Sequence, residues 1–297
     1  MINPHPGLPE LEYVMPASLD EASKFLIEHT GEAKPFMGGT DCFVRLRDGA
    51  WNLKYLVNVK GLDGTNEIRF DPKNGLTIGA AVPMNKIVSH PDINKHYPLL
   101  TEAARTVASY QLRSRATIGG NICNASPAGD TIGACIVYGG KLNVHSIKGK
   151  RLEPLASFFK GPGKTVLEPG DIVTSISFPL PPPNHVGRYI KLGRNKISDL
   201  AIVGVTVLGY PDSNAKSGYT FKIALASVAP VPLVPLKAEQ ILADKPLNEN
   251  IISEAAQAAM DSCTPIDDVR SSARYRKYMI RNLTRQALTD VWQKIKK

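Results

Sequence analysis

The sequence predicts an α+β fold in two successive parts, and three observations support it. Short apolar runs rich in β-branched residues alternate with helical patterns through the first half of the chain. A proline run at residues 179–183 interrupts regular structure, and strands followed by two helices occupy the rest. The 297 residues, 43% of them hydrophobic, suffice for two cores. We therefore expect one domain over residues 1–180 and another over residues 181–297.

The first predicted elements lead into a glycine turn. Residues 18–21 have the composition of a capping box, and apolar residues follow at helical spacing until Gly31. A strand at residues 35–37, a Gly-Gly turn at 38–39 and a second apolar segment at 43–46 come next.

The later elements follow from apolar periodicity. The pattern of residues 97–109 predicts an amphipathic helix that leads into a second glycine-containing loop. The other predicted elements are strands at 55–59, 76–80, 141–146, 172–178, 188–192, 202–208 and 219–228, and helices at 251–261 and 271–295.

The formal net charge is +9. A positive charge favours binding to nucleic acid, to an acidic membrane surface, to an acidic partner or to a phosphate cofactor. The basic residues are spread, with local density at 270–285 and at the terminal lysines, so a solvated surface is the simpler interpretation and no nucleic-acid partner is expected. No apolar run approaches the roughly 18 residues that cross a bilayer, and the first residues do not resemble a signal peptide. We expect a cytoplasmic protein without a membrane span.

The four cysteines and six histidines are scattered. Cys42, Cys123, Cys135 and Cys263 include no C-x-x-C pair and no spacing that would hold zinc or an iron–sulfur cluster. They predict reduced thiols and no metal ligands, so any metal that the system needs is expected on another chain.

Two glycine-rich segments carry the candidate chemistry. Adjacent glycines let successive backbone N–H groups turn toward one concavity, which binds phosphate oxygens. One Gly-Gly pair alone indicates a tight turn, whereas two pairs, each beside Thr and Asn or Asp, favour a phosphate-bearing ligand. The residues are Pro35, Phe36, Met37, Gly38, Gly39, Thr40, Asp41 and Cys42 in the first segment, and Thr117, Ile118, Gly119, Gly120 and Asn121 in the second.

Two other nucleotide motifs are excluded. No G-x-G-x-x-G lies between a strand and a helix, so neither segment is a Rossmann fingerprint. Residues 161–165 end like a P-loop, but Phe158 stands where that motif needs its first glycine. We interpret residues 161–165 as a surface turn.

Residues 116–130, ATIGGNICNASPAGD, closely resemble the signature loop of flavin subunits in the xanthine dehydrogenase and carbon monoxide dehydrogenase family. The resemblance extends over nearly the whole chain, through the first Gly-Gly segment and residues 161–176, 189–194 and 199–201. It is strongest toward the bacterial xanthine dehydrogenase type.

This resemblance implies a vanillyl-alcohol-oxidase-like FAD-binding domain with lobes at about 1–60 and 61–180, followed by a smaller α+β domain. Both glycine-rich segments would then wrap the FAD diphosphate and ribityl chain. Asp130 matches a cofactor-contacting residue, Val173 an apolar contact position and Lys191 a lysine near the flavin. Val107 stands where eukaryotic relatives often have an aromatic residue.

Simpler interpretations of these residues remain open. Lys191 fits an ordinary half-exposed strand position, and Asp130 fits a helix cap or a turn before residues 131–133.

If the chain binds FAD, Arg113 or Arg115 would offset the negative charge of the diphosphate.

The resemblance also implies partners. The family couples FAD to a molybdopterin centre and two [2Fe-2S] clusters, which this chain has no cysteine spacing to hold. We therefore expect a large molybdopterin-binding subunit and a small [2Fe-2S] subunit, in a dimer of heterotrimers. Electrons would reach FAD from the clusters and pass to NAD or another acceptor, with no catalytic side chain in this subunit. The alternatives are a stand-alone FAD-dependent oxidase or reductase acting on a small organic substrate, and a basic nucleic-acid-binding protein.

Overall fold

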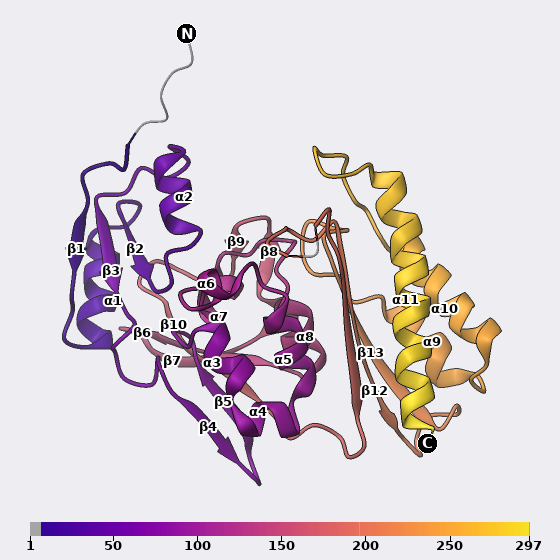
Figure 1. The fold of residues 1–297 in the computed structure, drawn as a ribbon. Helices are drawn as coiled ribbons and strands as arrows, with labels where there is room; N and C mark the ends of the chain where they lie inside the picture. The colour runs from indigo at the N-terminus through magenta and orange to yellow at the C-terminus, as the bar shows by residue number, and fades with distance from the viewer. Residues whose placement is uncertain (1–6, 196, 297) are drawn as a thin grey trace.

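The computed structural model describes residues 7–195 and 197–296 and confirms the predicted α+β class. Apart from the two-stranded β8–β9 hairpin, the described strands form three sheets that follow one another along the molecule (Figure 1). A small sheet comes first, a five-stranded sheet occupies the centre, and a three-stranded sheet with its helices lies at the far side.

The first sheet has the order β1-β3-β2 with parallel pairing, and α1 packs beside it. The Ser18 half of the predicted capping box is present, because the Ser18 hydroxyl accepts the Glu21 N–H at 3.1 Å. The Glu21 carboxylate reaches one residue further back and accepts the Ala17 N–H at 2.7 Å. Residues 43–46, the second apolar segment, lie in α2. The elements are β1 Glu12–Val14, α1 Leu19–Glu28, β2 Ala33–Phe36, α2 Cys42–Arg47 and β3 Tyr55–Asn58.

The central sheet is antiparallel with the order β4-β5-β10-β6-β7, and a run of short helices connects β5 to β6. Residues 161–165 belong to the β8–β9 hairpin, which confirms the predicted turn. The elements are β4 Ile68–Asp71, β5 Gly75–Gly79, α3 Met84–Ser89, α4 Pro91–His96, α5 Pro98–Arg105, α6 Tyr110–Arg113, α7 Ile118–Cys123, α8 Ile132–Val137, β6 Lys141–Ser146, β7 Gly149–Pro154, β8 Phe159–Gly161, β9 Lys164–Thr165 and β10 Ile172–Phe178.

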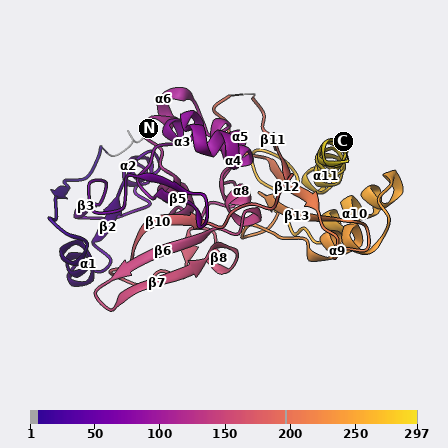
Figure 2. The same ribbon diagram turned by 90° about the horizontal axis from the view of Figure 1, so that it is seen from below.

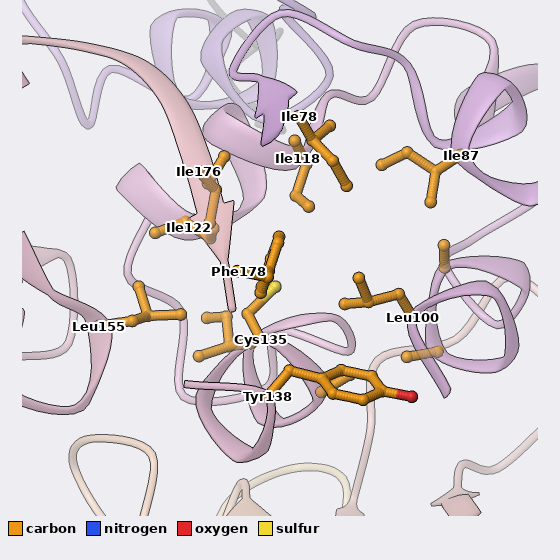
Figure 3. Packing of buried hydrophobic residues seen from close by; sticks show 14 of the residues in the cluster. Ile78, Ile87, Leu100, Ile118, Ile122, Cys135, Tyr138, Leu155, Ile176 and Phe178 are labelled. Atoms are coloured by element: carbon orange, nitrogen blue, oxygen red, sulfur yellow. The ribbon is translucent and has the colours of Figure 1, made fainter. Parts of the chain in front are cut away.

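The largest hydrophobic core lies between this sheet and its helices. Figure 3 shows Ile118 and Ile122 of α7 beside Ile176 and Phe178 of β10 in this core. The second glycine-rich segment is therefore anchored to the largest buried cluster.

The third sheet has the order β11-β12-β13 and is antiparallel. Helices α9, α10 and α11 cover one face, whereas α5 and α8 contact it from the central part (Figures 1 and 2). The elements are β11 Val186–Leu192, β12 Val203–Pro211, β13 Tyr219–Ala226, α9 Leu236–Asp244, α10 Glu249–Asp261 and α11 Ala273–Ile295.

One predicted helix is shorter than expected. The pattern at 97–109 gives α5, which ends at Arg105, and Ala108 then adopts a left-handed φ of 40°. The Arg113 guanidinium donates to the carbonyl oxygens of Val107 and Ala108 at 2.8 and 3.3 Å, which stabilises this turn. Helices α3, α4 and α9 were not predicted, because six to nine residues are too few to show a clear period.

No helix in the described residues combines the length and the apolar composition that crossing a membrane requires.

Candidate functional site

The first glycine-rich segment leaves β2 and enters α2 with its backbone donors free. Within the described chain, the N–H groups of Gly38, Gly39, Thr40 and Asp41 have no hydrogen-bond acceptor. Gly39 has a φ of 78°, a conformation that favours glycine, and a Cβ there would lie 2.8 Å from the Phe36 ring. A glycine turn with four successive N–H groups unpaired among the described residues is a candidate cradle for an anion.

The second glycine-rich segment is the start of α7 and uses its donors internally. The Gly119 N–H donates to the Ala80 carbonyl at 2.8 Å, and the Gly120 N–H donates to the Thr117 hydroxyl at 3.1 Å. The N–H groups of Ile118 and Asn121 are likewise taken by backbone carbonyl oxygens. The prediction of a second backbone cradle is therefore wrong, because the tertiary structure already satisfies these groups.

The two segments nevertheless meet in space. A Cβ on Gly38 would lie 2.3 Å from the Arg115 carbonyl oxygen, so only glycine allows this approach. The Thr117 hydroxyl also faces the Met37 sulfur at 3.9 Å. The cradle lies on one side of this contact, and Arg115 and Thr117, which lead into α7, lie on the other.

Asp130 lies at the join between the central part and the third sheet. Its carboxylate accepts the Tyr189 hydroxyl at 2.7 Å and the Lys191 ammonium at 2.8 Å, and the residue is 7% exposed. It does not cap α8, whose N-cap is Thr131. Burial raises the pKa of Asp130, and the Lys191 charge opposes that rise.

Lys191 is not the half-exposed strand lysine of the simpler interpretation. Its side chain is 12% exposed, and its ammonium also donates to the Thr106 carbonyl at 3.1 Å. Lys191 lines a groove of about 890 Å³ between α4–α5 and β11, together with Arg105, Arg188 and Arg194. The two glycine-rich segments do not line this groove.

The other candidates fall into different settings. Val173 lies in β10, is 3% exposed and belongs to the main core, and Val107 is also buried there. Arg113 is engaged by backbone carbonyl oxygens, whereas the exposed Arg115 has no acceptor within the described chain. Of these two arginines, Arg115 is therefore the one available to an anionic ligand.

Sequence reasoning missed Tyr189, which bonds Asp130 directly. The signal was faint: residues i and i+2 of a strand face the same side, so Tyr189 shares a face with Lys191.

All four cysteines are free thiols, as predicted. In the described part of the chain, no group of three or more His, Cys, Asp or Glu side chains could hold a metal ion.

The fold and the site together define a flavoprotein subunit. The chain belongs to the family of FAD-binding subunits of molybdopterin dehydrogenases: the model described as the FAD binding domain in molybdopterin dehydrogenase matches residues 9–181. The CO dehydrogenase flavoprotein C-terminal domain matches residues 188–291. The protein is accordingly an oxidoreductase subunit whose cofactor is FAD.

Individual relatives agree with this family. The chain is 30% identical to the carbon monoxide dehydrogenase medium chain of Hydrogenophaga pseudoflava, over 96% of this chain and 98% of the relative. It is 28% identical to a xanthine dehydrogenase FAD-binding subunit of Escherichia coli O157:H7, over 94% of each. A solved structure of the Hydrogenophaga pseudoflava enzyme superimposes with a TM-score of 0.92 at 29% identity, covering 97% of this chain and 99% of that one.

Proposed function

We propose that this subunit transfers electrons through FAD from [2Fe-2S] clusters on a partner to NAD or another acceptor. The observation that supports it is the run of four N–H groups at residues 38–41 that have no acceptor in the described part of the chain. A dinucleotide brings two phosphate charges, and such a run of donors fits them without a side-chain cation.

The proposed cofactor contacts are those of the two glycine-rich segments, together with Asp130, Val173 and Lys191. In this proposal residues 38–41 hold the diphosphate, and Thr117, Gly119 and Asn121 form the wall against which the cofactor lies. The exposed Arg115 guanidinium adds a charge-assisted contact. Val173 gives backbone and apolar support from the core.

When bound, FAD supplies the capacity to accept and release electrons singly or in pairs. The protein's own part is to bind and orient it and to set the local charge. Lys191 is the cation best placed for this, because it is nearly buried and held by two oxygen acceptors.

The proposed assembly contains a large molybdopterin-binding subunit and a small [2Fe-2S] subunit, as a dimer of heterotrimers in the cytoplasm. This chain would form two domains, 1–180, with lobes at about 1–60 and 61–180, and 181–297. Relatives of this chain are named as subunits of carbon monoxide, xanthine, glyceraldehyde and nicotinate dehydrogenases.

The test is co-purification of the chain expressed with its neighbouring genes, followed by rapid-mixing reduction of the complex. We expect one FAD per chain, iron–sulfur absorbance from the partner and reduction of NAD or an artificial acceptor by the complex. The isolated chain should bind FAD but oxidise no small organic substrate. An isolated chain that turns over an alcohol, lactone or aldehyde would instead favour the stand-alone oxidase.

A further inference from the structure

A buried group of three polar residues joins the signature loop to the third sheet. Tyr189 is 4% exposed, and its hydroxyl donates to Asp130 Oδ1 at 2.7 Å. Lys191 Nζ donates to Asp130 Oδ2 at 2.8 Å and to the Thr106 carbonyl at 3.1 Å. Both carboxylate oxygens are therefore occupied from β11.

The Tyr189 hydroxyl has a fixed role in this group. Burial and the neighbouring carboxylate raise the pKa of Tyr189 well above its ordinary value, so the hydroxyl keeps its proton and acts as a donor. A Cβ on Gly204 of β12 would lie 3.1 Å from this hydroxyl oxygen, so the glycine leaves the space beside which the hydroxyl lies.

Three charged side chains beside this group, Glu102, Arg188 and Asp290, pair with one another. Glu102 of α5 accepts the Tyr189 N–H at 3.1 Å and pairs with Arg188 at 2.5 Å. Arg188 also lies 3.3 Å from Asp290 of α11. Arg105 and Arg194 line the same groove at its exposed side. Asp130 is therefore the group that compensates Lys191.

We propose that Tyr189 is a positioning residue that keeps the Asp130 carboxylate ionised and directed at Lys191, so that the pair presents no net charge to the flavin. This inference rests on the proposed function. A buried carboxylate that loses one of its two donors is relieved most cheaply by taking up a proton. The Lys191 ammonium would then be uncompensated, and an uncompensated cation favours the negative charge that reduction adds to a flavin.

The test is the midpoint potential of the FAD-loaded full chain, measured from pH 6 to pH 9 as variant minus wild type. Tyr189→Phe removes one oxygen atom and should raise the potential at low pH, with the difference vanishing at high pH as Asp130 ionises. A tenfold change in the ratio of affinities for reduced and oxidised FAD corresponds to about 30 mV for a two-electron couple, and a shift of that order is expected.

The matched control is Tyr138→Phe, which removes the hydroxyl of another buried tyrosine, one that contacts His185 instead of Asp130. It should leave the potential at the wild-type value at every pH. An unchanged or lowered potential in Tyr189→Phe, or an equal shift in Tyr138→Phe, would overturn the inference.

Two further variants decide the matter should Tyr189→Phe not fold. Asp130→Asn leaves the Lys191 charge uncompensated and should raise the potential across the whole range. Lys191→Met should lower it at pH 9, where Asp130 stays charged without its partner. Shifts of the same sign in both variants contradict the proposal. A wild-type chain that binds no FAD overturns the proposed function as well, whereas FAD binding with unaltered potentials overturns this inference alone.

Discussion

The two glycine-rich segments have similar compositions but different structural roles. Residues 38–41 form a turn whose N–H groups are unpaired within the described chain, beside a small first sheet. Residues 118–121 begin a helix whose N–H groups are all paired, above the largest core of the molecule. In the first segment, glycine allows the left-handed backbone conformation of the turn. In the second, the absence of a Cβ lets the helix pack closely against Ala80. Composition alone does not distinguish these two uses.

The largest effect should come from Gly119→Ala. The new Cβ would lie 2.5 Å from the Ala80 Cβ and 2.7 Å from the Ala80 carbonyl oxygen, inside a packed core that yields little. We expect the free energy of unfolding to fall by about 3 kcal/mol, measured by urea denaturation of the FAD-free chain. Gly61→Ala is the control, because a Cβ there meets nothing within 4 Å. Equal stabilities of the two variants would contradict the packing role.

Gly38→Ala should affect the cofactor more than the fold. Its Cβ would lie 2.3 Å from the Arg115 carbonyl oxygen, but the turn is held by few internal bonds and can move away. This movement redirects the free N–H groups, so we expect a rise of about thirtyfold in the FAD dissociation constant, or about 2 kcal/mol. Flavin fluorescence titration measures it, with Gly61→Ala again as the control. A stability loss as large as that of Gly119→Ala, with normal FAD affinity, would abolish the contrast between the segments.

Each glycine-rich segment has one threonine, Thr40 in the first and Thr117 in the second, and their side chains should differ in the same way. Thr117 caps α7, because its hydroxyl accepts the Gly120 N–H, so Thr117→Ala should reduce the free energy of unfolding by about 1 kcal/mol. The Thr40 hydroxyl has no partner within the described chain, so Thr40→Ala should leave stability unchanged and weaken FAD binding by about 1 kcal/mol. Thermal unfolding and FAD titration of both variants give the result. The reverse assignment of effects would refute it.

Local features of the fold could be predicted from the sequence, because their causes are local. The capping box at residues 18–21 and the strand at 172–178 depend on neighbouring residues and on alternation. The paired state of the Gly119 N–H could not be predicted, since its acceptor, Ala80, lies far along the chain. The contact of Tyr189 with Asp130 likewise requires the third sheet to pack on the signature loop.

The last prediction concerns pH dependence, which should be the smallest effect near neutral pH, at one of the contacts between α1 and the central sheet. The Ser23 hydroxyl of α1 donates to the Gly170 carbonyl at 2.7 Å. The next residue, Asp171, accepts two hydrogen bonds from Arg151, at 2.8 and 2.6 Å. Burial alone would raise the pKa of Asp171, but the Arg151 bonds and the Glu168 N–H outweigh burial and lower it.

A carboxyl group whose pKa is lower in the folded state than in the unfolded state stabilises the fold at pH values above its unfolded-state pKa, about 3.9. This stabilisation is lost as the pH falls through the folded-state pKa. The difference in unfolding free energy between wild type and Asp171→Asn should therefore stay constant from pH 7 to pH 5 and shrink below about pH 4. Urea denaturation of the FAD-free chain at each pH measures it, with the exposed Asp63→Asn as the control. A difference that already changes between pH 7 and pH 5 would show that Arg151 does not hold Asp171 charged. The Gly170 carbonyl oxygen that accepts the Ser23 hydroxyl would then be held in place by contacts other than this ion pair.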